Sequence, residues 1–381
     1  MGGNQVKIES NFTAIEDASY SSHYEDESPK PLSWKITVGL TMSVIILVTL
    51  IGNLLVMISF ATDWRLRINR GNWFILNLSV SDFLIGLCVL PINTAWIVNE
   101  GWPFGETFCK IWIVIDYTAS YMSVLTMGMI SLDRYWLVTK KLAYQEFLTK
   151  TKVRLMLGSA WLFCIIFYTI VTFLWSVISG ETNIDYTEEC EMESVYNLGF
   201  NIFLIIIEFV LPLIVIDCLN YRIYRIIKER SQQFVRSKSD PINSMSRPNN
   251  AVGPMPDPVA PPDDDDIHTE HSSPVQEKKE FKKHKRAAFT LGVLIGIFIC
   301  CWLPYYITVI LGTFCESCVP DSVWEFTNNL LWCNSTLNPF LYALLHNRYR
   351  QNFIRILGLK GLYQRWTPSD GEGINTSESM M

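Results

Sequence analysis

Hydrophobic residues are concentrated in seven long runs, which are separated by shorter polar segments. Each run is longer than the ~20 residues that a helix needs to cross a lipid bilayer. A spanning segment must be a helix or part of a closed barrel, and the runs lack the ~10-residue alternating pattern of barrel strands. The sequence therefore predicts an all-α fold, a seven-transmembrane helix bundle. The runs cover approximately residues 36–61, 72–98, 107–138, 154–179, 198–227, 287–314 and 323–345.

The polar segments indicate the domain organisation. We expect residues 1–34 to form an N-terminal tail, 35–346 the helix bundle, and 347–381 a short amphipathic eighth helix with a cytoplasmic tail. Residues 229–280, within the bundle, contain many prolines and a run of aspartates, a composition that predicts a disordered loop. The two ends of this segment are basic and are expected to continue the flanking helices into the cytosol. In residues 348–359, apolar side chains alternate with arginines, which is typical of a helix that lies on the lipid of the inner leaflet.

Basic residues predict the orientation, because Lys and Arg remain on the cytoplasmic side of a membrane. The connections after the first and third runs are basic, as are both flanks of the 229–280 loop, whereas the connection 180–194 contains six acidic residues and no Lys or Arg. The N-terminus is therefore expected outside the cell and the C-terminus inside. The net charge of -6 averages these two faces. An acidic outer face would attract a cationic ligand, although the topology rule alone could also produce it.

The N-terminal tail is polar and acidic and shows no apolar signal-peptide segment, so the first helix must direct insertion. The sequence Asn11-Phe12-Thr13 in this tail is an N-glycosylation acceptor on the expected outer side.

The ten cysteines differ in their expected surroundings. Cys109 and Cys190 both lie at the outer side, in an oxidising compartment, and can pair. Cys315 and Cys318 share the last outer connection, where their spacing would also suit zinc or redox chemistry. Because there is only one such pair and no histidine nearby, a small loop disulfide is favoured. The other cysteines fall within the runs and are interpreted as small packing residues.

Asp116 is the only charged residue in the apolar segment 111–117. A carboxylate within a membrane helix costs roughly 2.5–3.5 kcal/mol, and a cation is its natural partner. Glu208 is a second acid, four residues before Pro212 in the fifth run. Two carboxylates that face one dry cavity repel each other unless a ligand supplies positive charge or hydrogen-bond donors. The alternative is that Glu208, and less readily Asp116, only accepts hydrogen bonds from a neighbouring helix.

An ordered set of motifs resembles the class A (rhodopsin-like) G-protein-coupled receptors in all seven runs. The matching residues are Asn53, Asp82, Asp133-Arg134-Tyr135, Trp161, Pro212, Phe298, Cys301-Trp302-Leu303-Pro304 and Asn338-Pro339-Phe340-Leu341-Tyr342. Cys109 and Cys190 also occupy the positions of that family's disulfide.

The resemblance implies a multi-pass plasma-membrane receptor that performs no bond chemistry. A ligand shifts the population of its conformations, and Arg134 contacts a heterotrimeric G protein. Arrestin is a further expected partner, and no nucleic acid is expected. His284 stands where many such receptors have an acid that restrains Arg134, so we expect basal signalling. The expected switch residues are Asp133, Arg134, Tyr135, Pro212, Asn220, Phe298, Pro304, Asn338, Pro339 and Tyr342.

Within this class, Asp116 resembles the ligand-binding aspartate of the amine receptors, and Glu208 resembles a glutamate of the third and fourth histamine receptor subtypes. This resemblance implies that the ammonium of histamine binds Asp116, that its imidazole binds Glu208, and that the G protein is of the cyclase-inhibiting type. Another amine, such as acetylcholine or an environmental or trace amine, remains an alternative. A cation transporter is a further alternative, although no inverted repeat is apparent. The expected ligand-binding residues are Trp112, Asp116, Tyr117, Glu208, Trp302, Tyr305, Tyr306 and Trp332.

A cluster of polar residues resembles the sodium site of the same family. It comprises Asp82, Ser123, Asn334 and Asn338. The resemblance implies an allosteric sodium ion, and no other cofactor or metal is expected. A water-filled polar network with the same residues is the alternative.

Overall fold

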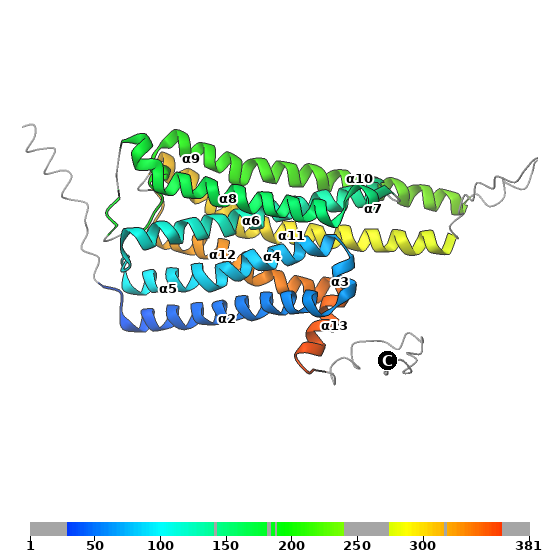
Figure 1. Cartoon of the computed structure of the whole chain (residues 1–381), viewed down its shortest axis with the longest axis horizontal. Helices are drawn as coiled ribbons and strands as arrows, with labels where there is room; N and C mark the ends of the chain where they lie inside the picture. Colours follow the sequence, from blue (N-terminus) through cyan, green and yellow to red (C-terminus); the bar gives the residue numbers. More distant parts are fainter. Residues whose placement is uncertain are drawn as a thin grey trace, which may run out of the picture.

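The computed structural model describes residues 29–140, 143–180, 184–186, 189–239, 274–315 and 318–359. Within these ranges the regular structure is entirely helical, which confirms the predicted all-α fold. The long helices run side by side along the longest axis of the molecule (Figure 1). Asn11 and the rest of residues 1–28 lie outside the described part, as do residues 240–273 and 360–381.

In the described part of the chain, seven helical passes build the bundle. The third pass is central, because it packs against the second, fourth, fifth and sixth. The passes are α2 (Leu32–Thr62), α4 (Gly71–Leu84) continued by α5 (Leu90–Asn99), α6 (Gly105–Lys140), α8 (Lys150–Ser179), α9 (Leu198–Ile205) continued by α10 (Leu211–Ser239), α11 (Pro274–Phe314) and α12 (Asp321–Leu345). Shorter helices connect some of them: α3 (Trp64–Ile68), α7 (Tyr144–Phe147) and η3 (Glu193–Tyr196).

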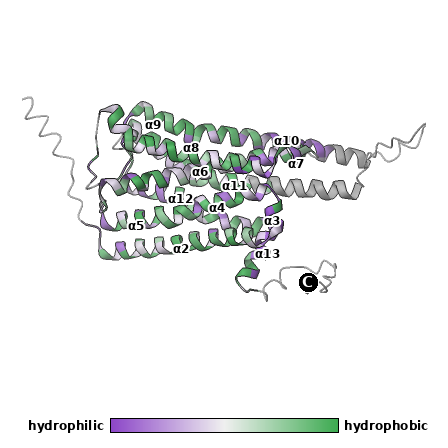
Figure 2. Ribbon diagram, in the orientation of Figure 1, coloured by the Kyte–Doolittle hydropathy of each residue, from purple (hydrophilic) through white to green (hydrophobic). Residues whose placement is uncertain are grey.

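Six of the described passes are long and apolar enough to cross a membrane. The seventh, α12, has 25 residues but is less apolar, because it carries several asparagines. Two of these, Asn334 and Asn338, are buried against the bundle, so the polarity of α12 is directed largely inward. The middle parts of the long helices are mostly hydrophobic, and polar residues are more frequent toward their ends (Figure 2). Many of the large hydrophobic side chains are exposed on the outside of the bundle.

Two passes contain a wider π-helical turn, η1 (Ile85–Val89) and η4 (Ile206–Val210). In η4, the N–H of Leu211 bonds to the carbonyl of Ile206, five residues earlier. The next bond of this kind would join the Ile207 carbonyl to the N–H of residue 212, but Pro212 has no N–H. The Ile207 carbonyl instead accepts a hydrogen bond of 3.2 Å from the Tyr121 hydroxyl of α6. The proline thus opens the turn that carries Glu208 and ties it to the central helix.

Buried polar side chains join the helices at several of the motif positions. Trp161 Nε1 donates to Asn77 Oδ1 at 2.8 Å, and Asn77 Nδ2 donates to Thr126 at 2.7 Å, so that α8, α4 and α6 are linked. Asn53 Nδ2 donates to the Ser335 carbonyl at 3.1 Å and links α2 to α12. These bonds fix the helices against one another around the pocket and the switch residues described below.

The predicted eighth helix is present as α13 (Asn347–Ile356), which contacts α2 and α12 and lies at a large angle to the long helices (Figure 1). Its Tyr349 and Phe353 are buried against the bundle, so Phe353 does not face the membrane as the sequence alone suggested. Asn352 Nδ2 also donates to Asp63 Oδ2 at 3.0 Å.

Both ends of residues 229–280 are helical, as expected from their basic helical patterns, so the bounds given for the disordered loop were too wide. Helix α10 continues to Ser239 and α11 begins at Pro274, so both extend beyond the other helices (Figure 1). Charged residues lower the hydropathy there without breaking a helix, because long charged side chains have good helix propensity. The middle of the segment lies outside the described residues.

Candidate functional site

A cavity of about 610 Å³ opens between the helices at the end of the bundle that carries both disulfides, hereafter the disulfide end. All eight ligand-binding residues expected from the sequence line it, although they come from four different passes. Among the described residues that line it, none is Lys, Arg or His. The cavity therefore has carboxylate and aromatic walls without a protein cation.

Asp116 projects from α6 into this cavity. Its Oδ1 accepts hydrogen bonds from Trp332 Nε1 of α12 at 3.0 Å and from Ser120 Oγ at 3.1 Å. Both bonds reach the same oxygen, so Oδ2 is left to accept from a ligand. An ionised carboxylate without a cation is costly in this setting, because leaving a buried ion unpaired costs about 3–5 kcal/mol. A ligand that brings a positive charge removes this cost.

Glu208 stands in the η4 turn and is only 8% exposed. Its Oε1 accepts from the Tyr168 hydroxyl of α8 at 2.7 Å, and its Oε2 accepts from the Tyr306 hydroxyl of α11 at 3.3 Å. The hydrogen-bonding alternative from the sequence is thus realised, yet Glu208 also lines the cavity. A carboxylate has about four lone-pair positions, so these two bonds leave room for a ligand donor.

Tyr168 was not singled out from the sequence. It is fully buried, lines the cavity and lies against the rings of Tyr117 and Tyr121, with ring centroids 5.4 and 6.2 Å away. The only available signal was a tyrosine in an otherwise apolar run, which does not indicate the direction of its hydroxyl.

The connection after Cys190 forms one wall at the mouth of the cavity. The disulfide between Cys109 and Cys190 ties it to α6, and the expected disulfide between Cys315 and Cys318 is formed in the loop between α11 and α12. Lys110 Nζ lies 3.4 Å from Glu193 Oε1, which also accepts from the Tyr186 hydroxyl at 2.8 Å. The covalent bond and the buried ion pair together hold this wall in place.

Glu191, which the sequence analysis did not select, also lines the cavity at its mouth. Its Oε2 accepts a hydrogen bond of 3.2 Å from the Tyr196 hydroxyl. Partial desolvation at the mouth, together with the nearby Glu189 carboxylate, raises the pKa of Glu191, although the residue is exposed. The cavity therefore contains three acids, at two different depths.

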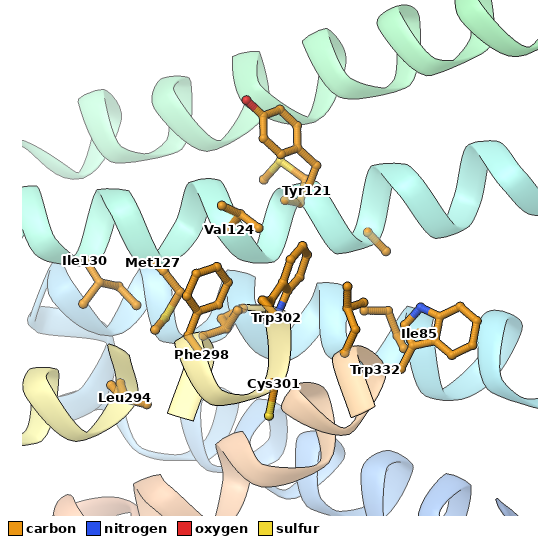
Figure 3. Packing of buried hydrophobic residues seen from close by; sticks show 14 of the residues in the cluster. Ile85, Tyr121, Val124, Met127, Ile130, Leu294, Phe298, Cys301, Trp302 and Trp332 are labelled. Carbon is orange, nitrogen blue, oxygen red and sulfur yellow. The ribbon is translucent and has the colours of Figure 1, made fainter. Parts of the chain in front are cut away.

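The floor of the cavity is aromatic. Trp302 and Phe298 project from α11 toward α6, where Met127 and Val124 lie close by (Figure 3). The ring of Trp302 is 5.2 Å from that of Phe298 and 6.2 Å from that of Tyr306. Tyr306, which donates a hydrogen bond to Glu208, thus contacts Trp302, and Trp302 contacts Phe298. Phe298 is only 1% exposed.

The opposite end of the bundle carries Asp133, Arg134 and Tyr135, and is hereafter the Arg134 end. Arg134 Nε lies 3.4 Å from Asp133 Oδ2, and the Tyr144 hydroxyl of α7 donates to Asp133 Oδ1. Asp133 is therefore the local partner of Arg134. The side chain of His284 lies outside the described residues. Asn220 Nδ2 donates to the Ile216 carbonyl at 2.6 Å and to Ser131 Oγ at 3.4 Å, which ties α10 to α6.

The remaining polar cluster surrounds Asp82, which is fully buried between the two ends. Asn338 Nδ2 donates to Asp82 Oδ2 at 2.7 Å, and Ser123 Oγ donates to Oδ1 at 3.4 Å. Asn334 is buried one turn away on α12. The structure thus brings three of the four expected residues into direct contact. Below them, Tyr342 is fully buried, Pro339 packs against Gly52 of α2, and Pro304 lies inside α11.

Comparison with known proteins places these features in a family. The model of the "7 transmembrane receptor (rhodopsin family)" matches residues 52–342. The human 5-hydroxytryptamine receptor 4 is 30% identical to the chain, over 85% of the chain and 80% of the receptor. A D(1)-like dopamine receptor of Takifugu rubripes is 29% identical, over 91% of the chain and 74% of the receptor. The human muscarinic acetylcholine receptor M1 is 26% identical, over 87% of the chain and 91% of the receptor.

Proposed function

The chain belongs to the rhodopsin family of seven-transmembrane receptors, and we propose that its ligand is a small protonated amine, histamine in particular. The relatives named above are receptors for amines, so a small-amine ligand is the common feature. Among amines, the choice of histamine is supported by a single observation, the presence of Asp116 and Glu208 in one cavity without a protein cation.

The two acids can accept hydrogen bonds from different groups of the ligand. Asp116 offers Oδ2 to the ammonium group, while its Oδ1 is held by Trp332 and Ser120. Glu208 is held by two tyrosines and can accept a further N–H, which the imidazole of histamine supplies. Leu204 and Ile205, one turn above Glu208, have no hydroxyl for a catechol. The quaternary ammonium of acetylcholine has no N–H donor for Glu208 at all.

The mechanism is a shift between conformations that the ligand stabilises to different extents. Histamine would bridge α6 to the η4 turn, and a ligand donor on Glu208 would compete with the hydroxyl of Tyr306, which stands 3.3 Å from it. Tyr306 stacks on Phe209, with ring centroids 4.3 Å apart, and contacts Trp302 below it. A change at Glu208 would therefore move the rings of α11, and with them the Arg134 end. The partner there is a heterotrimeric G protein of the cyclase-inhibiting class, followed by arrestin.

The test is a panel of histamine, serotonin, dopamine and acetylcholine on cells that express the receptor, with cyclic AMP as the readout. Asp116→Asn should abolish the response to every amine, because each ammonium loses its partner. Glu208→Gln should weaken histamine about 10–100-fold, as losing a charge-assisted hydrogen bond does, and should affect an imidazole-free phenethylamine far less. Asp217→Asn is the matched control, since Asp217 is an exposed acid of α10 outside the cavity. Unchanged histamine potency in Glu208→Gln, or a higher potency of another amine, would contradict the proposal.

We further propose that the Asp82 cluster binds a sodium ion. The fully buried Asp82 carboxylate and the Ser123 hydroxyl supply oxygen atoms of the kind that hard cations prefer, and the Asn338 amide N–H holds the carboxylate in place. The histamine dissociation constant should differ between sodium chloride and N-methylglucamine chloride at equal ionic strength, and Asp82→Asn should remove the difference. A wild-type receptor indifferent to sodium would favour the water-filled network.

The proposed orientation has the N-terminus outside the cell and the disulfide end facing the same side. Disulfides form in oxidising compartments, and both disulfides of the described residues occur at this end. An antibody to an N-terminal epitope tag should therefore bind intact cells. If the antibody binds only after permeabilisation, the N-terminus lies inside the cell and the proposed orientation is wrong.

A further inference from the structure

The cavity is larger than histamine requires. Its volume of about 610 Å³ lies in the range of pockets that enclose drug-sized ligands, whereas histamine is one imidazole ring with a two-carbon amine chain. Asp116 and Glu208 account for the deep part of the cavity. The part near the mouth contains the third acid, Glu191, for which a small amine at the deep acids has no use.

Glu191 is held in a fixed position. It follows Cys190, which the disulfide ties to α6, and precedes η3, whose Glu193 pairs with Lys110 at 3.4 Å. The side chains of Lys110 and Glu193 are only 9% and 3% exposed, so this pair is shielded from solvent. The Tyr196 hydroxyl, 3.2 Å from Glu191 Oε2, orients the carboxylate further. A group restrained in this way loses little conformational entropy when it binds a ligand.

The surroundings of Glu191 suit a cation. Tyr117 and Tyr305 line the same cavity as Glu191. Aromatic faces and a carboxylate together form the environment in which ammonium groups are recognised. No described Lys, Arg or His lines the cavity to neutralise Glu191.

We propose that Glu191 forms a second cation subsite at the mouth of the pocket, so that the receptor prefers elongated ligands with two ammonium groups. One ammonium binds Asp116 and the other binds Glu191. The inference rests on the proposed amine function, and it adds a ligand class, the long diamines, that the two deep acids alone would not select.

The test measures displacement of labelled histamine by α,ω-diaminoalkanes of increasing length, each paired with the 1-aminoalkane of the same length. At the optimal length the diamine should bind about tenfold more tightly than its monoamine, as one additional charge-assisted contact gives. In Glu191→Gln the ratio of diamine affinity to monoamine affinity should fall to one, within a factor of about two, while histamine affinity stays unchanged. Glu191→Asp, whose side chain is one methylene shorter, should shift the optimum to a longer diamine.

Glu189→Gln is the matched control, because Glu189 lies two residues away in the same loop and does not line the cavity. It should keep the wild-type ratio. A ratio near one at every length in the wild type, or an equal loss in both variants, would overturn the subsite while histamine binding still supports the proposed function. If neither histamine nor any alkylamine binds, the amine function itself fails and the subsite fails with it.

Discussion

Gly71, at the start of α4, packs directly against the ion pair of the Arg134 end. A Cβ added there would lie 2.5 Å from an Arg134 guanidinium nitrogen and 2.9 Å from Asp133 Oδ2. Gly71→Ala should therefore displace Arg134 from Asp133, at a cost of about 1–3 kcal/mol for such overpacking, and raise agonist-independent signalling. Nucleotide exchange on the G protein without agonist measures this. Gly158→Ala on α8 is the control, because nothing lies near its added Cβ. Equal basal activity in both variants would contradict the prediction.

Tyr168 stabilises Glu208 in the empty pocket through its 2.7 Å hydrogen bond. Tyr168→Phe should lower the unfolding temperature of the ligand-free receptor, since a buried hydrogen bond to a charged group contributes about 1.5–3 kcal/mol. Histamine supplies a new donor to Glu208, so the increase in unfolding temperature on adding histamine should be larger than in the wild type. Tyr121→Phe loses a bond to the Ile207 carbonyl instead and should leave the histamine-induced increase unchanged. An identical increase in all three receptors would argue against this role.

At the scale of elements, Asp63 connects three helices. It ends α2, caps α3 by accepting from the Arg65 N–H, and accepts from Asn352 of α13. Burial raises the pKa of Asp63, but the Asn352 and Arg65 hydrogen bonds and the nearby Arg348 and Arg355 outweigh it, so the pKa lies below its ordinary value of 3.8.

This depressed pKa fixes the sign of a pH effect. The stabilisation by Asp63 is fully present above pH 3.8 and is lost only as the pH falls through the lower folded pKa. A double-mutant cycle with Asp63→Ala and Asn352→Ala, scored by unfolding temperature, should give the same coupling at pH 7 and pH 5. Each single variant should weaken the docking of α13 by about 1 kcal/mol, as the loss of a partly buried side-chain hydrogen bond does. A coupling that disappears by pH 5 would show that Asp63 is already protonated there.

At the scale of the whole molecule, the aromatic series Tyr306, Trp302 and Phe298 connects the cavity to the lower bundle. Phe298 does not line the cavity, so its effect on the ligand must pass through Trp302. Phe298→Leu should leave histamine affinity without G protein nearly unchanged. In the wild type, G protein should raise histamine affinity by a coupling free energy of about 1–3 kcal/mol, and in Phe298→Leu by only a fraction of that. Competition binding with and without excess GTP analogue measures both quantities, and an undiminished gain would remove Phe298 from the linkage.

Much of the bundle was predictable from the sequence, because lipid allows few backbone structures and sets a minimum length for each span. The bounds given for the loop 229–280 were too wide, because hydropathy locates the part of a helix inside the membrane but not the point where the helix stops. Helices α10 and α11 continue into the basic ends of that segment, as the helical pattern there indicated.

The same contrast holds for the site. Asp116 and Glu208 were detectable because a charge in an apolar run is costly wherever the helix points. That both acids face one cavity, and that Tyr168 and Trp332 hold them, depends on the rotation and tilt of helices far apart in the chain. Glu191 was hidden among the other acids of its loop, and only the disulfide and the Lys110 ion pair bring it to the mouth. The sequence by itself determined which segments cross the membrane and which carry a buried charge, because each depends on local transfer energies. Only the tertiary structure decided which polar groups meet, because packing between distant helices sets those distances.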